Sequence, residues 1–422
     1  MYPNPQDVLP LPARPNLEQY KKQAKDLVKG CRTGAIDAFH AWAARWPDHA
    51  EEIERFARET LTSRDCALTA AQFVIARLHG FESWPKFSAH LDGLARATSP
   101  VSHFESAADA IVAGDEATLR RLLREHPELI RARSTREHRS TLLHYSAANG
   151  VENYRQKTPA NAVRIAEILL DAGAEVDAEA DMYGGRCTTL GLVATSVHPE
   201  RAGVANALMQ ILIDHGAAID YPRGVGHNHS FVVGCLANGR PAAAEYLATH
   251  GARLDLDGAA GLGRLDVVTG FFNADGSLKP PATVKQLRDG FNWACEYGRT
   301  DTVRFLLDRG VSVAASSPNG QTFLHSAALG GHDEIVRTLL ERGAPVGIVE
   351  KTYNGTPLTW ALHGWSEAAG ATRNRYPEVV ARLVAAGAEV NPEWLDADAP
   401  RTPFRDKLRA DARMLAALRG TQ

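Results

Sequence analysis

Histidines that alternate along an extended turn can share a metal ion, and His227 and His229 alternate in the sequence HNHS. A third ligand would have to come from a distant residue such as His198 or His363. No spaced carboxylate or cysteine completes the set. We therefore favour hydrogen bonding to a ligand or to a neighbouring turn over metal binding, and we expect no metal or other cofactor.

Glu296 is a carboxylate that could take part in catalysis. It lies beside Trp293 and Tyr297 in the sequence FNWACEYG. Partial burial against aromatic side chains would raise the pKa of Glu296 toward the range that suits general acid/base catalysis. The competing interpretation is an ordinary surface carboxylate paired with an arginine such as Arg264 or Arg299. We favour this second interpretation.

Thiol chemistry is not favoured, because no base can be assigned beside Cys187 or Cys235. The cysteines are odd in number and widely spaced, without a CxxC pair that would indicate zinc or a redox couple: Cys31, Cys66, Cys187, Cys235 and Cys295. This pattern is typical of reduced thiols. The sequence therefore predicts a cytoplasmic protein.

The charge balance excludes some classes of partner. Lys+Arg 47 against Asp+Glu 50 gives a net charge of -3, which provides no global attraction for nucleic acid or anionic lipid. No apolar run approaches the roughly 20 residues that cross a bilayer, and the proline-rich start MYPNPQDVLPLPARPN does not resemble a signal peptide. We expect a soluble protein with neither a nucleic-acid nor a membrane partner.

The elements that would position these groups are repeated helix pairs. Diverged copies of QTFLHSAALGGHDEIVRTLLERGAPV, at residues 321–346, recur from about residue 104 to 391. A glycine follows the second helical pattern of most copies, as expected of a left-handed helix end: Gly173, Gly216, Gly251, Gly310, Gly343 and Gly387. Such copies need neighbours to bury their apolar faces, which predicts a stacked solenoid.

The copy at 321 resembles the ankyrin family almost throughout, at Thr322, Leu324, His325, Ala327, Ala328, Gly331, His332, Ile335, Val336, Leu339, Leu340, Gly343 and Ala344. The resemblance implies an all-α ankyrin-repeat solenoid of about eight units, each with a finger-like turn and two antiparallel helices. It also implies structural roles for His144 and His325 at the helix starts. Insertions at 151–161, 197–203, 271–286 and 366–377 are the first places to look for lids over a binding face.

Residues 68–94, LTAAQFVIARLHGFESWPKFSAHLDGL, resemble a helical module often found ahead of ankyrin repeats in bacterial proteins. We expect Ser83 and Pro85 to start a helix, and Trp84 and Phe87 to pack in its core. The predicted domains are therefore an N-terminal helical module at 1–97, an ankyrin array at 98–395, and a C-terminal capping helix at 396–422.

The resemblance also implies which residues face the concave side, namely those of the fingers and of the inner-helix ends. Together with neighbouring aromatic residues, this selects a predicted ligand-binding set: Tyr145, Asn149, Tyr183, Cys187, His227, Asn238, Trp293, Tyr297, Tyr353 and Trp360. Aromatic faces with few charges suit a peptide or a small molecule better than a charged polymer. The alternative is that these large residues pack against folded insertions.

Ankyrin arrays usually bind other proteins, so the leading hypothesis is a module that grips a peptide or protein segment on its concave face. The alternative is an enzyme or small-molecule binder with a pocket between repeats 3 and 8. In that alternative Glu296 would be the general acid/base, with His229 and His363 as polarising donors. The sequence leaves open whether the protein is an enzyme.

Overall fold

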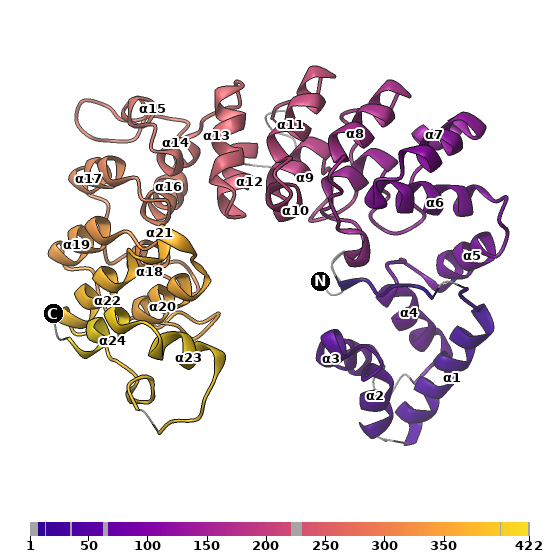
Figure 1. Cartoon of the computed structure of the whole chain (residues 1–422), viewed down its shortest axis with the longest axis horizontal. Coiled ribbons are helices and arrows are strands. Elements are labelled where there is room, and N and C mark those ends of the chain that lie inside the picture. The colour runs from indigo at the N-terminus through magenta and orange to yellow at the C-terminus, as the bar shows by residue number, and fades with distance from the viewer. Residues whose placement is uncertain are drawn as a thin grey trace. The chain divides into compact units, whose positions relative to one another are not determined.

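The computed structural model describes residues 7–12, 14–33, 36–61, 66–220, 230–396 and 398–420. These residues form helices and connecting turns, without a strand among them (Figure 1). Isolated extended pairs join Ala180 to Cys187, Phe272 to Leu278, and Ser316 to Thr322. The predicted all-α fold is confirmed. No helix in the described part of the chain is both long and apolar enough to cross a membrane.

The chain forms two compact units, residues 1–228 and residues 229–422. We call them the first unit and the second unit and describe each by itself. The domain boundaries near 97 and 395 were drawn from changes in sequence pattern and stay a prediction.

The first unit begins with five helices, the N-terminal module: α1 (Leu17–Thr33), α2 (Ile36–Ala43), α3 (Ala50–Thr60), α4 (Leu68–Leu78) and α5 (Trp84–Leu94). Ser83 precedes α5 and Pro85 lies in its first turn, as predicted. Phe87 is fully buried and stacks edge to face on Tyr20 at 5.0 Å between ring centres. Trp84 packs beside this core, so both aromatic residues have the expected packing role.

A disulfide joins Cys31, in the last turn of α1, to Cys66, just before α4, with the two Cα atoms 5.8 Å apart. The prediction of five reduced cysteines is therefore wrong for this pair. Helices α1 and α4 pack on each other, which brings together two thiols that are 35 residues apart in sequence. The disulfide removes the cysteine-based argument for a reducing compartment. Cys187, Cys235 and Cys295 are free and buried.

Helix pairs continue the first unit. Their bounds are α6 (Pro100–Ala113) with α7 (Glu116–Glu125), η4 (Leu142–Ala147) with α8 (Ala162–Asp171), and α9 (Thr189–Thr195) with α11 (Ala205–Asp214). The short helix α10 (Val197–Arg201) lies in the predicted insertion between α9 and α11. The insertion at 151–161 contains only the single turn η5 (Asn153–Arg155).

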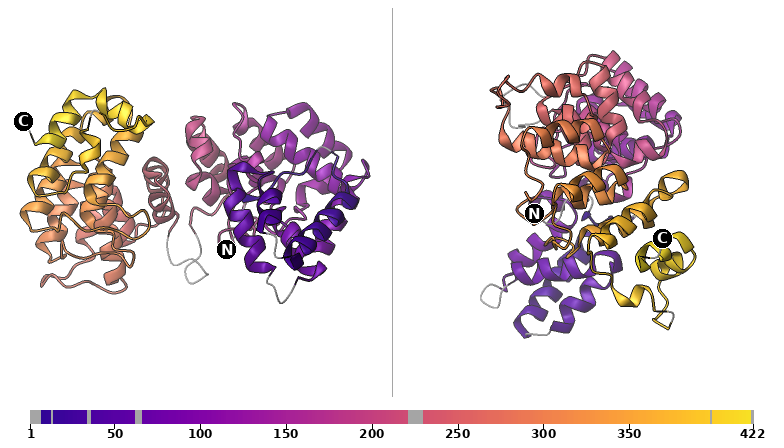
Figure 2. Two further views of the ribbon diagram at one scale, coloured as in Figure 1. Left: turned by 90° about the horizontal axis from the view of Figure 1, so that it is seen from below. Right: turned by 90° about the vertical axis from the view of Figure 1, so that its left-hand side faces the viewer.

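The second unit stacks further pairs in sequence order (Figures 1 and 2). They are α12 (Phe231–Ala237) with α13 (Pro241–Thr249), α14 (Leu256–Leu262) with α15 (Leu265–Thr269), α16 (Val284–Glu296) with α17 (Thr300–Asp308), α18 (Phe323–Leu329) with α19 (Asp333–Glu341), and α20 (Pro357–Glu367) with α22 (Tyr376–Ala385). Helix α21 (Gly370–Arg373) lies in the last insertion. The C-terminal segment forms two helices, α23 (Pro403–Arg409) and α24 (Ala412–Arg419), rather than one.

Buried histidines connect successive repeats. The Nδ1 atom of His325 accepts the backbone N–H of Thr322 at 3.1 Å, which closes the start of α18. Its Nε2 atom donates to the carbonyl oxygen of Gly355, in the next finger, at 3.2 Å. His144 repeats the arrangement with Thr141 at 3.2 Å and with the Cys187 carbonyl at 3.1 Å. The structural role expected for these two histidines is confirmed.

Glycine lets neighbouring inner helices approach closely. A Cβ atom on Gly364, in α20, would lie 2.3 Å from the carbonyl oxygen of Leu329 and 2.7 Å from the hydroxyl of Tyr376. Real contacts of that length do not occur, so any side chain here would force the helices apart. Glycine at this position is required by packing, not by backbone conformation.

We expect Gly364→Ala to lower the free energy of unfolding by about 1–3 kcal/mol, because the added methyl group overpacks α18 against α20. The measurement is chemical denaturation followed by circular dichroism. Gly347→Ala is the matched control, since a Cβ atom there would have no neighbour within 4 Å, and it should change stability little. Equal stability of the two variants would contradict this account of the interface.

Candidate functional site

Exposed apolar side chains gather in the finger that precedes α20. Of the seven exposed large hydrophobic residues in the described part of the chain, three lie here: Ile348 (38% exposed), Val349 (49%) and Tyr353 (79%). We call these three residues and the adjacent Trp360 the finger patch. Apolar side chains gathered on a surface, with aromatic residues among them, are typical of protein interfaces.

A buried carboxylate fixes the shape of this finger. Glu350 is fully buried and accepts backbone N–H groups from Thr352 at 2.7 Å, Tyr353 at 2.9 Å and Gly355 at 3.1 Å. Burial alone would raise the pKa of Glu350, but these hydrogen bonds outweigh burial and lower it. The carboxylate is therefore ionised at neutral pH and holds the turn in one conformation.

Aromatic contacts and a hydrogen bond to the neighbouring finger also hold the finger patch in place. Trp360 packs edge to face on Tyr353 at 6.5 Å and on His325 at 5.3 Å between ring centres. The backbone N–H of Lys351 donates to the carbonyl oxygen of Asn319 at 2.7 Å. The finger patch is thus rigid before any partner binds, which reduces the entropy lost on binding.

A shallow hollow of about 150 Å³ lies between α16 and the finger before α18. Its lining combines aromatic and polar side chains: Arg288, Asp289, Asn292, Trp293, Ser317, Gln321 and Phe323. Ser326 links two of them, since it accepts from the Gln321 amide at 3.0 Å and donates to Asn292 at 2.7 Å. This volume is below the roughly 300–1,000 Å³ of small-molecule sites.

Two larger hollows lie elsewhere. One of about 430 Å³, in the second unit, is bounded by the starts of α19 and α22. The other, of about 330 Å³, lies beside Trp46 and Tyr154 in the first unit. Neither lining contains any residue of the predicted site, so neither supports the pocket expected on the concave face.

Glu296, at the end of α16, is mostly buried. Burial raises its pKa to about 7, and the hydroxyl of the adjacent Tyr297 donates to the carbonyl oxygen of Leu236. Neither arginine considered from the sequence pairs with it: Arg264 contacts Asp266 at 3.6 Å, and the Arg299 side chain donates to a backbone carbonyl. A catalytic role for Glu296 stays a prediction.

The remaining predicted residues of the second unit are dispersed. His363 is exposed on α20, and Asn238 is exposed at the end of α12, where its amide donates to the carbonyl oxygen of Gly234 at 2.8 Å. His227 and His229 lie outside the described residues. Within the described ranges, no group of three or more histidine, cysteine or acidic side chains is placed to hold a metal ion.

In the first unit, burial removes two residues of the predicted ligand-binding set from the surface. Tyr145 is fully buried, with its hydroxyl 3.4 Å from the Glu152 carboxylate. The Cys187 thiol is 7% exposed, and burial raises its pKa to about 11, so it is not an activated nucleophile. Tyr183, in contrast, is 52% exposed and donates its hydroxyl hydrogen to Asn149 at 2.9 Å.

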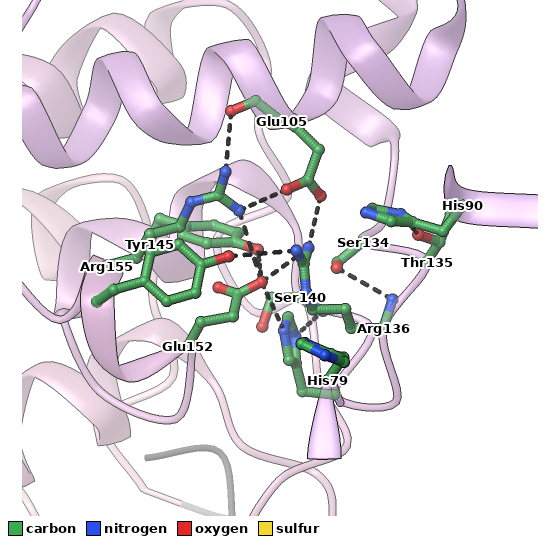
Figure 3. Close-up of polar contacts among 12 residues, drawn as sticks. His79, His90, Glu105, Ser134, Thr135, Arg136, Ser140, Tyr145, Glu152 and Arg155 are labelled. Carbon is green, nitrogen blue, oxygen red and sulfur yellow. Dashed lines mark hydrogen bonds and ion pairs between the residues drawn. The ribbon is translucent and has the colours of Figure 1, made fainter. Parts of the chain in front are cut away.

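Sequence reasoning missed a buried group of charges in the first unit, which we call the ionic cluster: Glu105, Arg136, Glu152 and Arg155. Both guanidinium groups point toward both carboxylates (Figure 3). Glu105 comes from α6, Arg136 from the finger at residues 132–141, and Glu152 and Arg155 from the insertion at 151–161. That insertion, expected as a lid, is instead buried at its start.

The charged groups of the ionic cluster lie within ion-pair distance of one another, and its two positive charges balance its two negative charges. Arg136 lies 2.6 Å from Glu105 and 2.9 Å from Glu152, and Arg155 lies 2.7 Å from Glu105. Burial opposes ionisation, but the two guanidinium groups lower the pKa of both carboxyl groups. Removal of either arginine would leave two buried carboxylates with one guanidinium group between them, and the uncompensated buried charge costs about 3–5 kcal/mol.

Comparison with known proteins identifies the repeats. Residues 291–393 match the sequence model of ankyrin repeats (3 copies). The chain contains ankyrin repeats. The match includes Trp293, Glu296, Tyr353 and Trp360, so the finger patch is part of an ankyrin stretch.

The chain matches known proteins over stretches of limited length. Over 112 residues the chain is 36% identical to the palmitoyltransferase Hip14 of Drosophila melanogaster, which covers 26% of this chain and 16% of that protein. Over 65 residues it is 38% identical to the ankyrin repeat-containing protein P1E11.10 of Schizosaccharomyces pombe, covering 15% and 31%. Over 61 residues it is 39% identical to inversin of Danio rerio, covering 14% and 6%. The chain thus spans less than a third of each relative.

The buried histidines of the first unit predict a loss of stability in mild acid. Burial lowers the pKa of His79, His90 and His144 from 6.5 to about 4. Between these values the unfolded chain binds more protons than the folded chain, so stability is complete above pH 6.5 and falls toward pH 4. Over this pH range, each histidine lowers the free energy of unfolding by on the order of 3 kcal/mol.

Urea denaturation at several pH values measures this slope. His79→Asn keeps a donor for the carbonyl oxygen of Leu9, which His79 contacts at 3.0 Å, and should make the slope shallower. His215→Asn, at an exposed position of the same unit, is the control and should keep the wild-type slope. A stability that does not change between pH 6.5 and 4 would contradict the burial of neutral imidazoles.

Proposed function

We propose that the second unit binds a protein segment through the finger patch. The observation that supports this most directly is the exposure of Ile348, Val349 and Tyr353 on one turn that a buried carboxylate holds rigid. Ankyrin repeats in residues 291–393 support an interaction module. The partner's identity, a cytoplasmic location and the bacterial origin suggested by the N-terminal module stay predictions.

The shape of the surface favours a macromolecular partner. The patch projects outward and the adjacent hollow is only about 150 Å³, whereas a small molecule needs enclosure to bury most of its surface. An extended or helical segment could instead lay an apolar side chain against Tyr353 and polar groups along Asn292 and Gln321. Tyrosine and tryptophan are common among residues that carry most of the binding energy of an interface.

The probe for this proposal is a set of peptides selected from a random phage library for binding to the full chain. We expect Tyr353→Ala to weaken the selected peptides by about 30-fold or more, equivalent to at least 2 kcal/mol, as measured by fluorescence polarisation. Val284→Ala is the matched control, since Val284 is 76% exposed in the same unit but lies outside the patch. Peptides that bind Tyr353→Ala and wild type equally would remove the finger patch from this role.

Glu350 should act as a positioning residue for the finger patch. We expect Glu350→Ala to weaken the same peptides by about 10-fold, because the turn loses the acceptor of three N–H groups and becomes disordered. Amide hydrogen exchange of residues 351–355 should rise in parallel. Weaker binding without faster exchange would contradict this positioning role.

The alternative, an enzyme or small-molecule site that uses Glu296, has one supporting observation, the rise of its pKa to about 7 through burial. A general acid at neutral pH needs such a value. Against it stands the small volume of the hollow beside Trp293. Glu296→Gln tests it: unchanged turnover of any substrate found for the protein would exclude Glu296 as the acid/base.

A further inference from the structure

The finger at residues 132–141, which we call the first finger, differs from two later fingers in the charged residues that it buries. Arg136 is 2% exposed and His138 is 5% exposed, although other residues of this finger are exposed. Two later fingers instead expose an aromatic residue, Tyr183 at 52% and Tyr353 at 79%. A charged side chain is buried only when specific partners replace water, so something must occupy this tip.

The N-terminal module occupies it. The backbone N–H of Glu137 donates to the carbonyl oxygen of Gly80 at 2.9 Å, and the Glu137 carboxylate pairs with Arg77 of α4. The hydroxyl of Thr135 lies 2.7 Å from the Nδ1 atom of His90, in α5. Backbone, ionic and side-chain contacts therefore join the first finger to the module over two of its helices and the turn between them.

Arg136 anchors the contact. Its guanidinium carbon lies 5.6 Å from the ring centre of Phe81, a core residue of the module, in the arrangement of a cation–π contact. The same guanidinium pairs with Glu105 and Glu152 in the ionic cluster. One side chain thus connects the module, the first helix pair and the insertion within the second pair.

We infer that the N-terminal module is the resident partner of the first finger and excludes external proteins from it. An incoming protein would have to break the Gly80 and Arg77 contacts and displace the Phe81 ring from Arg136. The next finger along the first unit, at residues 181–187, stays accessible through Tyr183, and it joins the first finger by the Asp181 N–H to the His138 carbonyl oxygen at 2.8 Å. This inference concerns the first unit and holds whether or not the finger patch binds a protein.

The test removes two side-chain contacts between module and finger, the Arg77–Glu137 ion pair and the Thr135–His90 contact, without altering the ionic cluster. Arg77→Ala and Thr135→Ala are combined in the full chain, and amide hydrogen exchange is measured by mass spectrometry for residues 79–84 and 132–141. We expect exchange to rise by about ten-fold or more in both segments together, because each protects the other. Arg164→Ala removes an exposed ion pair with Glu167 on α8 and should leave both segments unchanged.

A rise confined to the first finger, or no rise in either segment, would overturn the inference. A second measurement keeps the Arg77 and Gly80 contacts in place and tests exclusion directly. Thr135→Cys and Tyr353→Cys are labelled separately with N-ethylmaleimide and with a maleimide that carries a 5 kDa polyethylene glycol chain. The described native cysteines are either buried or in a disulfide, so the background is low.

For each position we compare the ratio of the labelling rate with the bulky reagent to the labelling rate with the small one. We expect this ratio to be about ten-fold lower at position 135 than at position 353, because the module limits approach to the first finger. Equal ratios at the two positions would show that a macromolecule can reach the first finger, and would overturn the exclusion.

Discussion

The hydrogen bonds of one buried imidazole set the spacing of the repeats. In His325, one ring nitrogen closes the start of α18 and the other reaches the carbonyl oxygen of Gly355 in the next finger. His144 does the same toward Cys187. Because both ring nitrogens are used, a helix cannot shift without moving the following finger. The surfaces of the two fingers that these histidines reach, including the finger patch, depend on this connection.

Two fingers of the chain use buried charge in opposite ways. In the last finger, Glu350 turns its carboxylate inward to three N–H groups, which leaves Tyr353 free to face solvent. In the first finger, Arg136 enters the ionic cluster and is itself buried. The same turn thus serves outward recognition in one place and internal attachment in another, and the difference lies in which partners the buried charge finds.

Features encoded at short sequence separation could be predicted. The phrase around Thr322 and His325 predicts a capped helix start, and Ser83 with Pro85 predicts the start of α5. The ionic cluster could not be predicted, because Arg136 is 31 residues from Glu105 and only the packing of α6 against the first finger brings them together. For the same reason the burial of Tyr145 and the Cys31–Cys66 disulfide were missed, since both depend on contacts between distant segments.

The finger that carries Tyr353 makes its own hydrogen bonds. The Glu350 N–H donates to the Gly355 carbonyl oxygen at 2.9 Å, and the Glu350 carboxylate accepts backbone N–H groups of the same turn. Lys351, Thr352, Tyr353 and Asn354 all face solvent. An engineer could therefore randomise the first three of these positions to graft new specificities onto the chain, while the helices beneath keep their sequence and their fold. Asn354 would be kept, because its φ of 53° is unfavourable for most side chains.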